Sequence, residues 1–102
     1  MMMAHDSGPP PAAGLAEETV ERARLALSLY LEDPEGQGEA LRRSLDDMAA
    51  EARGKSMLPE HLLVVLKDIW YGLPAVRAID DASAQIRLLQ RVVTMCIKEY
   101  YR

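Results

Sequence analysis

Residues 59–72 have the sequence PEHLLVVLKDIWYG, and this segment carries the clearest helix signal in the chain. Pro59 is pre-set for the first position of an α-helix, where its missing N–H would have no intrahelical partner. Between positions 62 and 71 only Lys67 and Asp68 are polar, so the segment is apolar on nearly every side. A helix with this pattern is typical of the centre of a helical domain.

Three more helices are expected around this segment. Apolar residues recur at helical spacing in residues 15–31, in residues 38–53, and again after a loop at residues 73–81. No segment alternates with period two, so we expect no strands. The sequence therefore predicts one all-α domain over residues 15–102, an antiparallel four-helix bundle with short loops.

Local signals mark the ends of these ordered segments. Gly54 is the expected C-terminal cap of the second helix. Asp80, Asp81 and Ser83 are the alternatives for the N-cap of the last helix. Residues 1–14 contain a run of prolines and two glycines with little to bury, and they predict a flexible tail.

The composition excludes several classes of protein. Hydrophobic residues make up 49% of the chain and charged residues 27%, as in ordinary globular domains. Cys96 is the only cysteine, which rules out an intramolecular disulfide and favours a reducing compartment. The longest apolar run, residues 62–66, is too short to span a bilayer, and no targeting segment is recognisable. We therefore expect a cytoplasmic protein with no membrane partner.

The charge is unevenly distributed along the chain. The formal net charge of −4 argues against non-specific binding of nucleic acid by the whole molecule. Residues 1–34 hold six acids and two bases, whereas residues 82–102 hold one acid, Glu99, and four bases. A helical nucleic-acid-binding domain that uses the bases of the last helix is therefore one alternative function.

Three features resemble catalytic or ligand sites. Residues 49–56, AAEARGKS, match a relaxed phosphate-binding-loop pattern, but without the glycine-rich backbone or the preceding strand, so we expect a helix end. His61 would suit a phosphorelay bundle, the second alternative, yet the Lys and Gly typical of histidine phosphotransfer domains do not follow it. Cys96 is expected to be a buried small hydrophobe. We infer no enzyme, cofactor, metal site or small-molecule substrate.

The last helix carries more apolar surface than one core-facing stripe needs. Its main stripe consists of Ile86, Leu89, Val93, Cys96, Ile97 and Tyr100. A second apolar line lies between this stripe and a basic strip, and apolar residues together cover about 200° of the helix. Either both lines are buried because the helix is central, or the second line contacts another protein chain.

A smaller signal of the same kind lies on the first helix, where two leucines one turn apart face away from the predicted core. We therefore expect a non-catalytic interaction or regulatory module whose partner is another protein chain or a second copy of itself. The predicted partner-binding residues are the second apolar line, Leu88, Val92 and Met95, the basic residues Arg87, Arg91 and Lys98, and, as secondary contacts, Leu25 and Leu29.

Overall fold

The computed structural model describes residues 14–102, and this part of the chain is all-helical, without strands. The helices are α1 (Glu17–Glu32), α2 (Gly38–Gly54), α3 (Pro59–Gly72), α4 (Pro74–Arg77) and α5 (Ala82–Tyr100). The predicted all-α class is confirmed. The predicted flexible tail lies outside the described residues, apart from Gly14.

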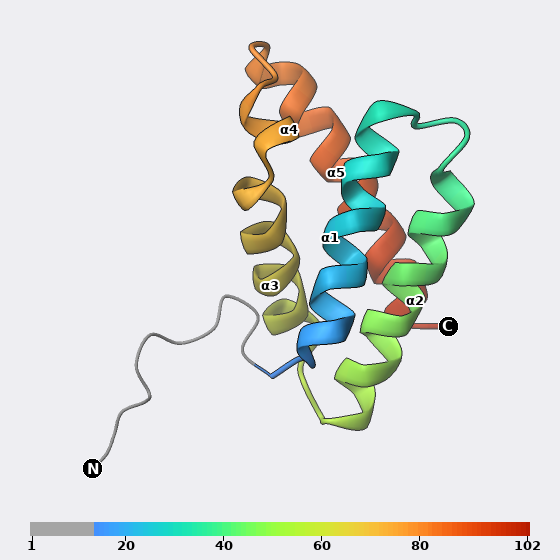
Figure 1. The fold of residues 1–102 in the computed structure, drawn as a ribbon. Coiled ribbons are helices and arrows are strands. Elements are labelled where there is room, and N and C mark those ends of the chain that lie inside the picture. The colour runs from blue at the N-terminus through green and yellow to red at the C-terminus, as the bar shows by residue number, and fades with distance from the viewer. Residues whose placement is uncertain (1–13) are drawn as a thin grey trace.

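The four long helices alternate in direction along the chain (Figure 1). Helices α3, α1 and α2 stand side by side, and α5 crosses obliquely behind them (Figure 1). Because of this crossing, α5 packs against α2 and α3, while α1 packs mainly against α2. The predicted antiparallel four-helix bundle is confirmed only in part, since α5 is oblique and the short helix α4 lies between it and α3.

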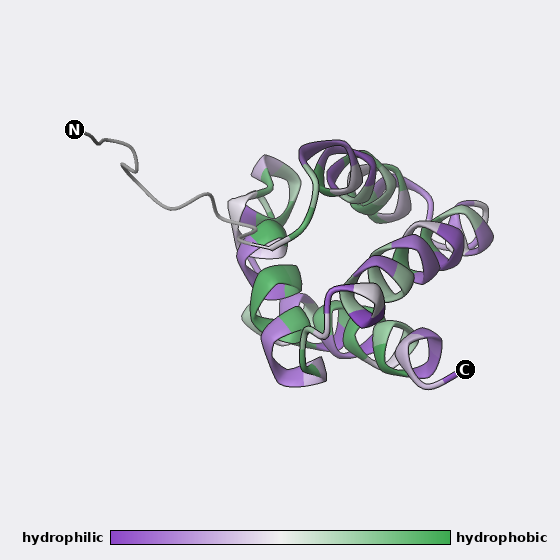
Figure 2. Ribbon diagram, turned by 90° about the horizontal axis from the view of Figure 1, so that it is seen from below, coloured by the Kyte–Doolittle hydropathy of each residue, from purple (hydrophilic) through white to green (hydrophobic). Residues whose placement is uncertain are grey.

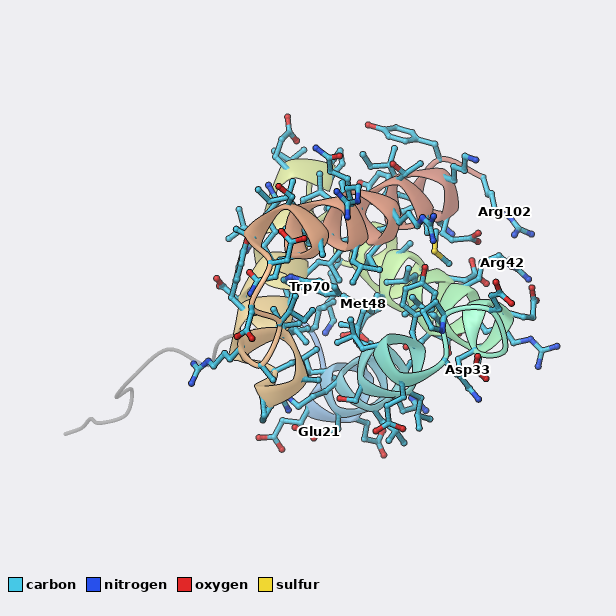
Figure 3. The ribbon with its side chains drawn as sticks, turned by 90° about the horizontal axis from the view of Figure 1, so that it is seen from above. Glu21, Asp33, Arg42, Met48, Trp70 and Arg102 are labelled. Atoms are coloured by element: carbon cyan, nitrogen blue, oxygen red, sulfur yellow. The ribbon has the colours of Figure 1, made fainter. Side chains whose placement is uncertain are left out.

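The core lies between α5 and the other long helices. Trp70 and Met48 point into this space, with α5 on one side and α1 on the other (Figure 3). Hydrophobic segments of the helices face the interior and hydrophilic segments lie outside (Figure 2). All five residues of the narrow apolar stripe on α2 are buried: Leu41, Leu45, Met48, Ala49 and Ala52.

The prediction that α3 is the central helix is wrong: α3 lies at one end of the row α3, α1, α2 (Figure 1), and one of its sides faces solvent. Leu66 and Trp70 are completely buried. Val64 and Tyr71 remain 56% and 50% exposed. The outward side of α3 therefore carries these two apolar side chains among the exposed polar residues Glu60, His61, Lys67 and Asp68.

The end of α2 differs from the prediction. Gly54 is the last helical residue and has no positive φ, whereas Ser56 adopts the left-handed conformation with φ 59°. The Met57 N–H donates to the Ala52 carbonyl at 2.8 Å and the Ser56 N–H donates to the Arg53 carbonyl at 3.1 Å. This pair of bonds is a Schellman closure with Ser56 in the position that glycine usually occupies. The predicted cap at Gly54 is therefore wrong by two residues.

The segment between α3 and α5 also differs in part. We expected a loop over residues 73–81, but Pro74 begins the one-turn helix α4 inside it. A single turn is too short to show helical periodicity in a sequence. Of the alternative N-caps for α5, the structure selects Asp81, whose carboxylate accepts the Ser83 N–H at 2.9 Å.

Candidate interaction surface

The side of α5 that faces the core is the one where its main apolar stripe meets its second apolar line. Val92 and Cys96 are fully buried, whereas Ile86 is 51% and Ile97 is 38% exposed. Because α5 contacts α2 along one side and α3 along the other, the direction between these two contacts faces the core. The prediction that Val92 lies on an exposed line is therefore wrong, and so is the assignment of Ile86 and Ile97 to the core.

An open groove with a volume of about 750 Å³ runs along the outer face of α5. Its lining residues all belong to that helix: Ala84, Arg87, Leu88, Gln90, Arg91, Thr94 and Met95. Leu88 and Met95 are half-buried. One part of each side chain packs against the core, and the exposed part forms the apolar portion of the groove. Four of the residues predicted to bind a partner thus line one groove. Lys98 is exposed one turn beyond Thr94 and is not part of the lining.

A second groove, with a volume of about 470 Å³, lies between α3 and α5. It is lined by Lys67, Tyr71, Ile86, Leu89, Gln90, Val93 and Thr94. It shares Gln90 and Thr94 with the first groove, so the two lie on either side of one ridge of α5. Sequence reasoning missed this groove because Ile86 and Val93 were placed on the core-facing stripe. The apolar circumference of residues 59–72 was a signal for it.

The charged side chains that line the two grooves are all bases. They are Arg87 and Arg91 in the first groove and Lys67 in the second. Within residues 14–102, none of these bases forms an ion pair with an acid. Their positive charge is therefore directed at solvent and available to a partner.

The only acid on α5 points the other way. Glu99 is 4% exposed, and its carboxylate accepts hydrogen bonds from Arg42 of α2 at 3.4 Å and from Arg102 at 3.0 Å. Arg53 of α2 donates to the carbonyls of Glu99 and Tyr100 at 3.0 and 2.9 Å. These bonds satisfy carbonyls at the C-terminal end of α5 and fix that end to α2. Sequence reasoning missed this cluster, although a lone acid among bases was a signal for it.

The secondary contacts predicted on α1 are exposed but lie elsewhere. Leu25 is 60% and Leu29 is 38% exposed. Helix α1 and helix α5 lie on opposite sides of the core (Figure 3). The structure therefore does not bring these leucines together with the α5 groove of the same molecule.

The segment that resembles a phosphate-binding loop has a structural role. The Glu51 carboxylate accepts the Ala16 N–H at 2.6 Å, the Thr19 hydroxyl, and the Lys55 ammonium at 2.7 Å. Lys55 also donates to the Gly14 carbonyl at 2.8 Å. Burial acts to raise the pKa of Glu51, but the hydrogen bonds from Lys55, Thr19 and Ala16 outweigh it and lower this pKa to about 2. The carboxylate thus occupies the N-terminal end of α1, where an anion is favoured.

The remaining reactive side chains lie away from the grooves. His61 is exposed in the first turn of α3 and lines neither groove. Cys96 is buried as predicted, and this burial, together with the nearby Glu99, raises the pKa of its thiol to about 11. Among residues 14–102, no group of three or more His, Cys, Asp or Glu side chains could hold a metal ion.

Both grooves belong to the part of the chain that the structure describes, residues 14–102. None of its helices is both long and apolar enough to cross a lipid bilayer. No protein-family model, curated protein or solved structure matches the chain, so the chemistry of its own surface is the guide to its function.

Proposed function

We propose that the protein is a non-catalytic helical interaction module, a variant of the antiparallel four-helix bundle, that docks another protein chain on the outer face of α5. The observation that carries this proposal is the α5 groove, in which Leu88 and Met95 form an apolar floor beside Arg87 and Arg91. Methionine and arginine are enriched at protein interfaces, where an apolar contact is combined with hydrogen bonding at the rim. The Thr94 hydroxyl is the one potential nucleophile of the lining, and no His, Asp, Glu or Lys lines the groove beside it to act as its general base.

The charge of the groove defines the partner's chemistry. A helix laid into a groove contacts it through residues spaced three and four apart. Arg87 and Arg91, which pair with no acid of residues 14–102, favour a helix with acidic side chains beside its apolar contacts, because complementary charge directs association and disfavours wrong partners. The partner is therefore an acidic amphipathic helix.

The proposal can be tested with a synthetic peptide. The probe is an acidic amphipathic helix with leucines three and four residues apart and glutamates beside them, and the control peptide has lysines in place of these glutamates. Titration of the ¹⁵N-labelled protein with the acidic peptide should shift the amide resonances of residues 84–95, and the lysine peptide should not. Shifts confined to other helices, or equal binding of both peptides, would contradict the proposal.

Two variants sharpen this test. Arg91→Glu should weaken binding of the acidic peptide at least tenfold, because it reverses a charge in the groove. Arg43→Glu makes the same change of net charge on α2, at a side chain that is 77% exposed and outside both grooves, and should leave binding unchanged. Equal weakening by both substitutions would show that net charge alone governs binding and would overturn the proposal.

The same bases favour nucleic acid as a second candidate partner. In that case duplex DNA would bind through Arg87, Arg91 and Lys98, and its affinity would fall steeply as salt is raised. A direct competition between duplex DNA and the acidic peptide distinguishes the two. Displacement of the peptide by DNA at low concentration would replace the proposed function with nucleic-acid binding.

A further inference from the structure

The outer face of α1 has the chemistry of the helix that the α5 groove should bind. Five exposed residues of this helix fall within about 80° of its circumference. They are Glu18, Glu21, Leu25, Leu29 and Glu32. Arg24 pairs with Glu21, and Arg22 borders the face, but the face as a whole remains acidic. The face thus presents two leucines one turn apart between acids.

The basic strip of α5 has a matching length. Arg87 and Lys98 are eleven residues apart, as are Glu21 and Glu32 of α1. Each pair therefore spans about 16 Å along its helix, at about 1.5 Å per residue. The leucines of α1 lie between the two acids, and the apolar floor of the groove lies between the two bases.

From this match we infer that the occupant of the α5 groove is α1 of a second copy of this chain, an inference that rests on the proposed function. Leu25 and Leu29 of one copy pack onto Leu88 and Met95 of the next, and the flanking acids face the flanking bases. Pairing of two α5 grooves with each other would instead bring bases against bases, which costs free energy. The acidic faces of two α1 helices are disfavoured for the same reason.

The position of the two surfaces determines how copies are added. Helices α1 and α5 lie on opposite sides of the core (Figures 1 and 3). One molecule can therefore use its groove for one neighbour and its α1 for another, which is a heterologous, head-to-tail contact. Such a contact adds copies beyond the dimer, in a ring or a chain. The mass of the native protein in sedimentation should accordingly rise with concentration past that of a dimer.

Two blocked variants test the contact from either side. The α1-blocked variant carries Leu25→Gln and Leu29→Gln, and the groove-blocked variant carries Arg87→Glu and Arg91→Glu. All four side chains are exposed, so both variants should keep the native fold, which circular dichroism checks. Each variant alone should be at least tenfold weaker in self-association than the native protein. An equimolar mixture should form a one-to-one complex, because each variant retains the surface that the other lacks.

The outcomes separate this inference from the proposed function. A native protein that stays monomeric at every concentration, while the acidic peptide still binds residues 84–95, overturns the inference and leaves the proposed function standing. Failure of the peptide as well overturns both. Self-association of the α1-blocked variant at native strength, or a mixture without a one-to-one complex, shows that α1 is not the occupant. Arg43→Glu serves as the charge control and should assemble as the native protein does.

Discussion

Glu51 connects two helices through one carboxylate. It lies on α2, yet two of its hydrogen-bond donors, the Ala16 N–H and the Thr19 hydroxyl, belong to the start of α1. Helix α1 has no side-chain N-cap of its own. Glu51 therefore satisfies N-terminal groups that would otherwise lack a partner, and Lys55 neutralises its charge.

Replacement of this carboxylate should destabilise the fold. We expect Glu51→Gln to lower the free energy of unfolding by about 1.5–3 kcal/mol, the range for hydrogen bonds to a charged group. Chemical denaturation at neutral pH measures this change. Glu35→Gln, at an exposed residue of the α1–α2 loop, is the matched control and should change stability little.

The same carboxylate predicts a pH dependence. Because the pKa of Glu51 is lowered from 4.5 to about 2 in the folded protein, its contribution to stability is complete above pH 4.5 and is lost as the pH falls through 2. Between about pH 6 and about pH 2, the free energy of unfolding should therefore fall less in Glu51→Gln than in the native protein, as denaturation curves at each pH would measure. Parallel pH profiles for the two proteins would show that Glu51 does not carry this dependence.

Cys96 should be inert in the folded state. Its side chain is completely buried and its pKa is raised to about 11, so the reactive thiolate is scarce and inaccessible at neutral pH. Alkylation by iodoacetamide, followed by mass spectrometry, should be negligible without denaturant and complete with it. Labelling of the native protein at the rate of free cysteine would show that the core around α5 opens readily.

At the scale of a helix, the end of α2 contains a residue in an unfavourable conformation. Ser56 has φ 59°, a region that costs a residue with a Cβ about 1–2 kcal/mol. Ser56→Gly should therefore raise the free energy of unfolding by about 1 kcal/mol. Thermal denaturation measures the change.

Gly54 provides the complementary test. A Cβ at this position would meet nothing within 4 Å, and the residue is helical, so Gly54→Ala should stabilise the protein by about 0.5–1 kcal/mol. If Gly54 were instead the left-handed cap that the sequence suggests, the alanine would be strained and stability would fall. The sign of the change thus distinguishes the two positions of the cap.

The rotation of α5 about its axis can be tested in the same way. Val92→Asn should cost about 3 kcal/mol or more, because it places a polar group in a fully buried site. Ile86→Asn, in the same helix at a side chain that is 51% exposed, should cost far less. Similar losses in urea denaturation would mean that the helix is rotated differently.

At the scale of the whole molecule, two opposite surfaces carry charge of opposite sign. The acids of α1 lie on one side of the core and the bases of α5 on the other (Figure 3). Because exposed charges are screened over about 10 Å at 0.1 M salt, association through these surfaces should weaken as salt is raised to about 1 M. Sedimentation at several salt concentrations measures this dependence. Association that strengthens with salt would indicate a purely apolar contact.

Local pattern was sufficient for the long helices. The expected ranges 15–31 and 38–53 agree with Glu17–Glu32 and Gly38–Gly54 to within two residues, and Pro59 begins α3 as predicted. Helical periodicity and proline at the first turn depend only on residues near each other in the chain. A single turn such as α4 lacks that periodicity, and for this reason it was missed.

The order of residues is enough to predict that the chain is helical, where its long helices lie and which one carries a surplus of apolar residues and bases. The packing of the helices was needed to establish that Val92 faces the core and Ile86 does not, that Glu99 turns inward, and that α1 and α5 lie on opposite sides. When a helix has two adjacent apolar lines, its amphipathic pattern does not determine which side of the helix faces the core. The oblique contact of α5 with α2 and α3 determines that rotation, because it selects the side of the helix that loses its contact with water.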